Sequence, residues 1–294
     1  MRNTITYRHW QPGDDDAVLK LLVPAEQCNE DYYRKKFNSS SLAPEGIRLA
    51  IVGQRVVGHV LGSRTSLFVE GRIQDFGLVT FVFVAPDMRR QGIATRLMQE
   101  LHAHFQKAGY RGSILDVDTK EAIQLYQKVG YQKFTQELQT QLLPNSDVSQ
   151  LKWTEVNLKD LSAFPQLDER WAKHNFPVVW EPQGMKVHQY TMSGYRVLRH
   201  GQKIVGYSRW EKPSEYYPHG LIKDPIVPEM DSMEVIAAVQ AAIPAPRAWQ
   251  TCEGSRYEDP LLSLGCTLEL TQRVDMLLSF GPEIDWTGLA RTFI

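Results

Sequence analysis

The segment best suited to chemistry is a basic turn with a single glycine, Arg89-Arg90-Gln91-Gly92-Ile93-Ala94. An apolar, β-branched stretch from Leu78 to Val84 precedes it and predicts a buried strand. After the turn, apolar residues recur at helical spacing up to Gly109, which predicts a helix. A strand, a glycine turn and a helix direct backbone N–H groups and the positive helix end at one point. Because Gly92 leaves the backbone accessible among arginines, the segment predicts a site for a phosphate group.

The spacing of this turn excludes two common nucleotide-binding loops. A dinucleotide site requires G-x-G-x-x-G, and a P-loop requires G-x-x-x-x-G-K-[ST]; the chain has neither pattern here. Its own pattern, R-x-x-G-x-A, begins three residues after Val84-Ala85-Pro86. It resembles the pyrophosphate loop of the GNAT superfamily of N-acetyltransferases, Q/R-x-x-G-x-G/A. The alternative is an ordinary strand, loop and helix with solvated arginines.

A second motif, about 30 residues downstream, resembles another pattern of the same family. The segment Ala122-Ile123-Gln124-Leu125-Tyr126-Gln127-Lys128-Val129-Gly130-Tyr131 is similar to A-x-x-L-Y-x-x-x-G-F/Y. Its apolar residues share one helix face, and Gly130 is placed to end the helix. The resemblance implies that Tyr126 reaches the sulfur of coenzyme A. The alternative is a tyrosine that only packs in the core.

The surrounding sequence predicts the elements that position these motifs. We expect a strand over Ile5–Arg8, a helix over Ala17–Leu22, a hairpin over 49–61, a strand over Ser113–Val117 and a final strand over Phe134–Leu143. This order predicts an α/β fold with a mixed, mostly antiparallel sheet flanked by helices. The resemblance covers residues 1–143.

The second half of the chain repeats the first weakly. His200-Gly201-Gln202-Lys203 aligns with Val52-Gly53-Gln54-Arg55, and Val227-Pro228-Glu229 aligns with Ala85-Pro86-Asp87 when the prolines are matched. The offset shrinks along the chain, as small deletions in a duplicated domain would produce. We therefore predict two GNAT-like domains in tandem, over 1–143 and 151–294, with a linker over 144–150.

The repeat diverges where the chemistry is expected. Asp231-Ser232-Met233-Glu234 replaces the arginines and the glycine of the first half, and Leu261 stands at the place of Tyr126. A pyrophosphate there would meet like charge and a blocked backbone. The second half is therefore expected to support the first, to help form an acceptor pocket, and not to bind the cofactor.

The resemblance implies acetyl-CoA as co-substrate, held where two central strands separate. The pantetheine arm would pair with backbone groups of one strand, and the Val84 N–H would stabilise the oxyanion. Tyr126 would protonate the leaving thiolate. The expected cofactor-binding residues are Val82, Phe83, Val84, Arg89, Arg90, Gln91, Gly92, Ile93, Ala94 and Thr95.

The expected general base is a carboxylate, because an alkyl amine is protonated at neutral pH. Asp116 is the first candidate, since it lies in a strand whose neighbours Leu115 and Val117 face the other way. Asp75 and Asp118 are alternates. A solvated surface acid is the competing interpretation for each.

The function predicted from these residues is N-acetylation of a primary amine on a small molecule, by direct attack on acetyl-CoA. Two alternatives stay open: acetylation of a protein N-terminus or lysine, and a non-catalytic module that binds acyl-CoA. The acceptor and the oligomeric state are not predicted by any motif.

Composition predicts a cytoplasmic globular protein without metal. The net charge of −1 and the 23% charged residues give no reason to expect nucleic acid or membrane as partner. No apolar stretch approaches 18 residues, and the N-terminus lacks a signal-peptide pattern. The cysteines Cys28, Cys252 and Cys266 are scattered, without the spacing of metal ligands. The apolar tail over 281–294 is expected to dock.

Overall fold

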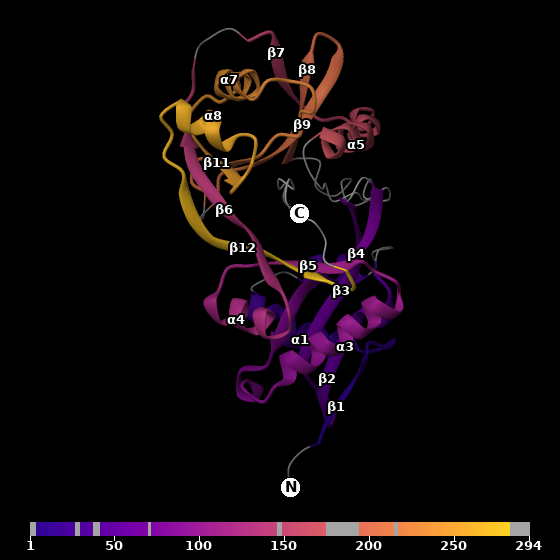
Figure 1. Ribbon diagram of the computed structural model, residues 1–294. Coiled ribbons are helices and arrows are strands. Elements are labelled where there is room, and N and C mark those ends of the chain that lie inside the picture. Colours follow the sequence, from indigo (N-terminus) through magenta and orange to yellow (C-terminus); the bar gives the residue numbers. More distant parts are fainter. Residues whose placement is uncertain are drawn as a thin grey trace. The chain divides into compact units, whose positions relative to one another are not determined.

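The computed structural model describes residues 4–26, 30–37, 42–69, 72–145, 149–174, 194–214 and 217–282 (Figure 1). Contacts divide the chain into two compact units. Unit 1 comprises Met1–Thr65, Gln74–Phe134 and Val274–Ile284, and unit 2 comprises Ser66–Ile73, Thr135–Arg273 and Asp285–Ile294. Cys28 and most of the apolar tail lie outside the described residues.

Unit 1 contains the elements expected around the two motifs. Its strands are β1 (Ile5–His9), β2 (Ile47–Val52), β3 (Arg55–Val69) up to Thr65, β4 (Arg72–Val84) from Gln74, β5 (Gly112–Val117) and the second part of β12 (Glu269–Ser279). Its helices are α1 (Asp15–Glu26), α2 (Glu30–Phe37), α3 (Ile93–Lys107) and α4 (Lys120–Lys128), with short 3-10 turns η1 (Pro44–Gly46) and η2 (Pro86–Met88).

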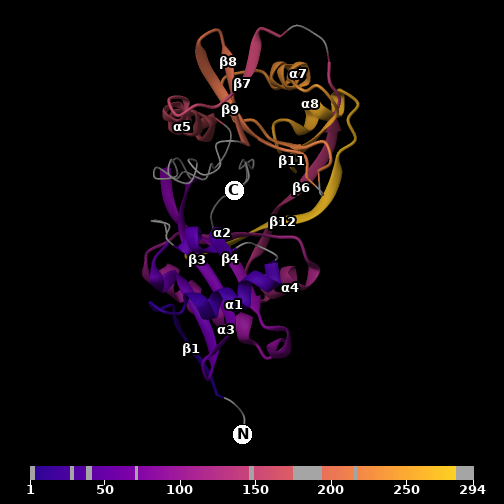
Figure 2. The same cartoon turned by 180° about the vertical axis from the view of Figure 1, so that it is seen from behind.

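The sheet of unit 1 is mixed, with the order β1-β2-β3-β4-β5-β12. Strands β1, β2 and β3 pair antiparallel, β4 and β5 pair parallel, and β12 runs antiparallel to β5. Helices α1 and α3 lie on opposite faces of this sheet (Figures 1 and 2). The predicted fold class, a mixed sheet flanked by helices, is confirmed.

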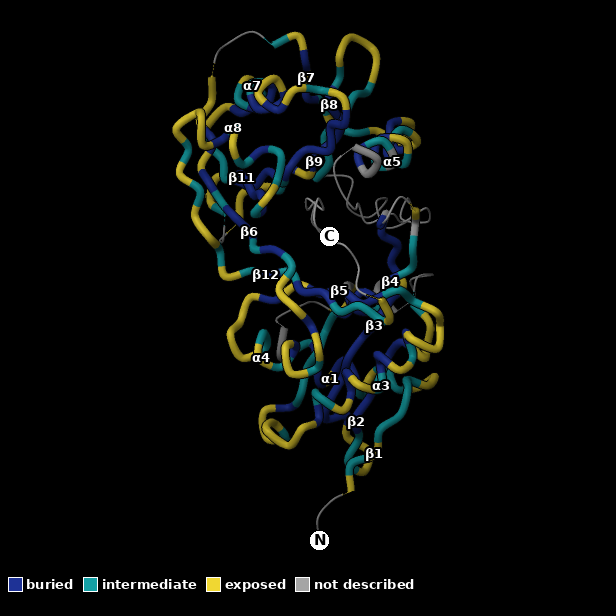
Figure 3. The backbone as a smooth tube through the Cα atoms, viewed as in Figure 1, coloured by how far each residue is buried: buried dark blue, intermediate teal, exposed yellow. Residues whose placement is uncertain are grey.

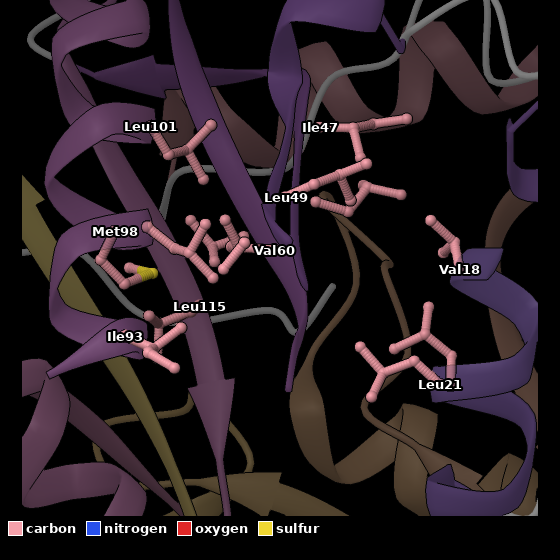
Figure 4. Close-up of a cluster of buried hydrophobic side chains, with 14 of the residues drawn as sticks. Val18, Leu21, Ile47, Leu49, Val60, Ile93, Met98, Leu101 and Leu115 are labelled. Atoms are coloured by element: carbon pink, nitrogen blue, oxygen red, sulfur yellow. The ribbon is translucent and has the colours of Figure 1, made fainter. Parts of the chain in front are cut away.

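Helix α3 is held against the sheet by an apolar face at helical spacing. Ile93, Leu97, Met98, Leu101 and Phe105 are each at most 1% exposed, and burial of one such side chain contributes about 1.5–3 kcal/mol. Figure 4 shows side chains of α3 and of α1 on the two sides of the strands, and Figure 3 shows buried stretches of these strands beside intermediate ones. The helix packs so closely that a Cβ on Gly77 would lie 2.1 Å from the Phe105 ring.

A hydrogen-bonded chain ties α3, β4 and β5 together beneath α4. The Ser113 hydroxyl donates to the Gly77 carbonyl at 3.0 Å, and it lies 2.7 Å from the Tyr131 hydroxyl. His102 Nε2 lies 3.2 Å from that same hydroxyl. Desolvation lowers the pKa of His102 to about 4, so its ring is neutral at pH 7. These buried bonds fix the end of α4 against the sheet.

Unit 2 contains a second sheet with its own helices. Its strands are β6 (Gln132–Leu142), β7 (Leu151–Glu155), β8 (Tyr195–His200), β9 (Lys203–Glu211), β10 (Leu221–Lys223) and β11 (Arg247–Cys252). Its helices are α5 (Phe164–His174), α7 (Ser232–Ala242) and α8 (Glu258–Ser263), with the 3-10 turn η3 (Asp160–Ala163). Among the residues described, no helix is long and apolar enough to cross a membrane.

The two sheets follow the same plan. The order in unit 2 is β7-β8-β9-β10-β11-β6, and β10 and β11 are parallel as β4 and β5 are. The hairpins match in detail, with register shifts between Ala50 and Ile51 and between Leu198 and Arg199. Such agreement is what the predicted duplication requires.

The last strand of each half pairs in a way that the sequence analysis did not anticipate. Strand β6, expected to complete the first domain, pairs with β11, and Val274–Ser279 of β12 pairs with β5. The units therefore differ from the predicted division into 1–143 and 151–294. Alternating polarity predicts a half-buried strand, but it does not say which sheet the strand joins.

Candidate active site

The centre of unit 1 contains a gap between two parallel strands. Strands β4 and β5 pair only over Phe76–Gly112, Gly77–Ser113 and Leu78–Ile114, although β4 continues to Val84 and β5 to Val117. Beyond that register the two strands separate at their carboxyl ends. Ligands of open α/β sheets bind at such ends. The expected residues Val82, Phe83 and Val84 line this gap on the β4 side and are partly buried.

Strand β4 is kinked just before these residues. Phe81 has φ 53°, a left-handed conformation that is rare for a bulky residue. Its carbonyl lies 2.8 Å from Nδ1 of His59 on β3, and His59 is fully buried. Because a carbonyl can only accept, Nδ1 carries the proton. Desolvation lowers the pKa of His59 to about 4, so the ring is neutral at pH 7 and is not a general base for an amine.

The basic turn follows the gap and opens its backbone to solvent. Arg90 has φ 64° and Gly92 has φ 78°, so two residues of the turn are left-handed. A Cβ on Gly92 would meet nothing within 4 Å. Helix α3 begins at Ile93, and its N-cap Gly92 supplies no capping side chain. The first-turn amides of Ile93 to Thr95 are therefore directed at the turn without a side-chain acceptor.

Positive charge surrounds this uncapped helix end. Arg89 and Arg90 are exposed, and within the described part of the chain neither forms an ion pair. Arg89 Nε donates to the Val84 carbonyl at 3.1 Å, and its guanidinium lies 5.4 Å from the Phe83 ring. Helix polarity and two arginines together suit a diphosphate.

The corresponding helix of unit 2 carries a side-chain cap at its N-terminus. The side chain of Asp231 caps α7 by accepting from Met233 N at 2.8 Å and from Glu234 N at 3.3 Å. In α7 the carboxylate accepts from first-turn amides whose counterparts in α3 have no side-chain cap. It also adds negative charge at that helix end. Leu261, at the place of Tyr126, is fully buried in α8.

The predicted acid and base belong to the same unit. Tyr126 lies on α4, is 8% exposed, and packs edge-on against Tyr131 with ring centroids 5.9 Å apart. It belongs to the core cluster that Val82 to Val84 pack against. Asp116 is exposed on β5 while Leu115 and Val117 are buried, so the predicted alternation is confirmed. In register, Asp116 lies opposite Asp275 of β12.

The alternate bases lie elsewhere in unit 1. Asp75 precedes the register shared by β4 and β5, and its carboxylate lies 3.6 Å from Arg64. Asp118 is exposed in the loop between β5 and α4. Among the described residues, no group of three or more His, Cys, Asp or Glu side chains is arranged to hold a metal ion.

A cavity of about 640 Å³ adjoins the end of β4 on the side of α1. Phe83 and Pro86 line it, together with the basic residues Lys20 and Arg55. Arg55 is paired twice with Asp87, at 2.7 and 2.8 Å. Sequence analysis missed this cavity because α1, the β2–β3 turn and η2 are distant in the chain. It also missed His59, whose only signal was a histidine inside an apolar strand.

Comparison with known proteins supports the relationship that the motifs predicted. Residues 46–133 match the acetyltransferase (GNAT) domain. The N-terminal acetyltransferase B complex catalytic subunit NAA20 of Arabidopsis thaliana is 34% identical over 83 residues. Those residues are 27% of this chain and 45% of that protein, so the chain matches less than half of this relative's length.

Solved structures resemble nearly the whole chain. A GCN5-related N-acetyltransferase from Anabaena variabilis has a TM-score of 0.69 at 15% sequence identity. The match covers 93% of this chain and 72% of the Anabaena chain. A conserved protein from Enterococcus faecalis, described as a probable N-acyltransferase, has a TM-score of 0.70 at 12% identity, with the same coverages. At these identities the likeness shows the fold, and it includes both units.

Proposed function

We propose that this chain, whose residues 46–133 match the acetyltransferase (GNAT) domain, transfers an acetyl group from acetyl-CoA to a primary amine of a small molecule. The observation that supports this most strongly is the turn from Arg89 to Ala94. Its helix end has no side-chain cap, and a Cβ on Gly92 would meet no atom within 4 Å. Arg89 and Arg90 lack an ion-pair partner within the described residues. These features fit a diphosphate at the β4–α3 junction.

The gap between β4 and β5 supports the direction of the bound co-substrate. Because β4 no longer pairs with β5 beyond Leu78, backbone groups of Val82 to Val84 can pair with the amide groups of the pantetheine arm, as with an added strand. The Val84 carbonyl is the exception, since it accepts from Arg89 Nε. The thioester would then lie beside β4 with the diphosphate at α3.

The proposed reaction is direct attack by the neutral amine on the thioester carbonyl. The new C–N bond forms, and the Val84 N–H stabilises the oxyanion; one such donor contributes about 3–4 kcal/mol. Collapse then breaks the C–S bond, and the Tyr126 hydroxyl gives its proton to a thiolate whose conjugate acid has a pKa near 8.5. A positioned acid contributes roughly 10²–10⁴ in rate.

The amine must first lose a proton. We assign this step to the Asp116 carboxylate, which is exposed on β5 at the separated end of the strands. The protonated amine loses two protons in forming the amide. The first goes to Asp116 before the attack and on to solvent, and the second leaves the nitrogen of the tetrahedral adduct and restores the Tyr126 hydroxyl after it has protonated the thiolate. Asp75, which lies beside Arg64 and before the gap, is less suited to the role.

A second candidate function is acetylation of a protein N-terminus. The observation that favours it is the name of the 34% identical relative, an N-terminal acetyltransferase subunit. The match extends over 83 residues, 27% of this chain, and leaves most of the chain without a counterpart in that relative. A non-catalytic module that binds acyl-CoA is the third candidate.

We further propose that only unit 1 binds acetyl-CoA. Asp231 fills the helix end of α7 that a diphosphate would need, and the buried Leu261 offers no proton. Unit 2 then serves the fold and the choice of acceptor. The scattered cysteines support a reducing compartment such as the cytoplasm.

Two measurements separate these candidates. Calorimetric titration with acetyl-CoA tests binding, and release of coenzyme A is then assayed over a panel of amines and of peptides with free N-termini. Turnover of small amines supports the first proposal, and turnover confined to peptides supports the second. Binding without turnover across the panel identifies a binding module, and absence of binding refutes all three.

A further inference from the structure

The backbone of β4 is strained at one residue, in the middle of the candidate site. A left-handed conformation at φ 53° is unfavourable for phenylalanine and persists only where surrounding groups hold it. The strained residue separates the part of β4 that pairs with β5, ending at Leu78, from the open part at Val82 to Val84. The kink therefore lies beyond the part of β4 that pairs with β5 and directly before Val82 to Val84.

The kink is held on two sides. From β3, Nδ1–H of His59 donates to the Phe81 carbonyl at 2.8 Å, and the imidazole is 0% exposed. From α2, the ring of Tyr33 lies 4.6 Å from the ring of Phe81. Desolvation lowers the pKa of His59 to about 4, so this donor keeps the same protonation state throughout the neutral pH range.

We propose that His59 is a positioning residue for acetyl-CoA, which holds the Phe81 carbonyl in the strained kink and so keeps the backbone of Val82 to Val84 out of regular pairing with β5. This inference rests on the proposed function, because the ligand is the one assigned to that backbone. His59 itself is fully buried and does not contact the co-substrate.

The physical reason lies in what β4 would do without the bond. A buried carbonyl that loses its donor is unfavourable, and the strained φ then loses one of the contacts that maintain it. The strand can relax toward regular β geometry, which realigns the amides of Val82 to Val84. The loss should therefore be measured in the affinity for acetyl-CoA and not only in stability.

The test compares two substitutions of His59 by calorimetric titration with acetyl-CoA. His59→Leu removes the donor and should weaken binding about tenfold or more, the equivalent of one hydrogen bond. His59→Asn places an amide N–H near the former Nδ1 and should stay within about threefold of the wild-type dissociation constant. In the steady state the leucine variant should show a raised KM for acetyl-CoA and a smaller change in kcat.

His102→Leu is the matched control, because it removes another buried imidazole of unit 1, one that lies 3.2 Å from the Tyr131 hydroxyl. It should lower the melting temperature but leave the acetyl-CoA affinity unchanged. A further variant, His59→Leu with Phe81→Gly, should bind more tightly than His59→Leu alone, because glycine adopts a positive φ without strain.

The outcomes distinguish this inference from the proposed function. Equal affinities for wild type and His59→Leu would overturn the positioning role, and so would equal losses for His59→Leu and His102→Leu. If His59→Leu does not fold, a His59→Asn variant with wild-type melting but tenfold weaker binding would also overturn it. Wild-type protein that fails to bind acetyl-CoA would refute the proposed function itself.

Discussion

Replacing Gly92 with valine tests the assignment of the phosphate-binding turn. Gly92 is exposed, has φ 78°, and a Cβ there would meet no atom within 4 Å. The valine side chain therefore has room, and the only intramolecular cost is the left-handed backbone, about 1–2 kcal/mol. Since small domains are stable by about 5–15 kcal/mol, the variant should remain folded.

The cost to co-substrate binding should be larger. The valine methyl groups occupy the side from which a diphosphate approaches the amides of the first turn of α3. Losing one hydrogen bond to a charged group costs about 1.5–3 kcal/mol, so the dissociation constant for acetyl-CoA should rise about 10- to 100-fold.

Gly109→Val provides the control for backbone strain. Gly109 follows the other end of α3, is exposed, has φ 79°, and also has nothing within 4 Å of its Cβ position. Both variants should lower the melting temperature by a similar amount, but only Gly92→Val should weaken the binding of acetyl-CoA in calorimetry. Unchanged affinity in Gly92→Val would refute the assignment of the turn, and equal losses in both variants would attribute the effect to α3 stability.

Three further predictions concern catalysis, stoichiometry and acid stability. Tyr126→Phe should lower turnover about 10²-fold with little change in acetyl-CoA affinity, whereas a tyrosine that only packs would change the melting temperature alone. Calorimetry should give one acetyl-CoA site per chain, because Asp231 caps the second helix; two equivalent sites would contradict this. For His59, the pKa of about 4 lies below the unfolded value of about 6.5, so its contribution is full above pH 6.5 and decreases as the pH falls toward 4. The stability difference between wild type and His59→Leu in urea titrations should therefore shrink by about 2 kcal/mol at pH 5, and a constant difference would contradict the buried neutral ring.

Features that depend on local sequence could be predicted. The helical spacing of apolar residues predicted a helix that extends up to Gly109. In the structure α3 ends at Lys107, and Gly109 has φ 79°. Likewise Gly130, at φ 101°, follows the end of α4. A glycine that ends a helix and a 3.6-residue period act within a few residues, so a single sequence contains them.

Features that depend on tertiary contacts could not be predicted in the same way. The apolar pattern of β3 ended at Leu61, yet the strand runs to Val69, because Ser63, Thr65 and Ser66 are polar but buried. The kink at Phe81 has no signature in an apolar run, since its carbonyl is held by a side chain from another strand. Sequence analysis could therefore find the loop of the site but not the shape of the strand beside it.

The pairing of β6 with β11 and of β12 with β5 gives the second half a structural role that does not depend on binding a co-substrate. Met276 and Leu277 of β12 are at most 6% exposed, and their strand pairs along the whole of β5, which carries Asp116. A chain ending at residue 143 would lack this strand and leave the edge of β5 unpaired beside the site. Strand β12 is therefore required for the sheet of unit 1, although α7 of the same half carries the Asp231 cap at its N-terminus. The sheet of unit 1, which carries the candidate site, therefore needs residues from both halves of the chain.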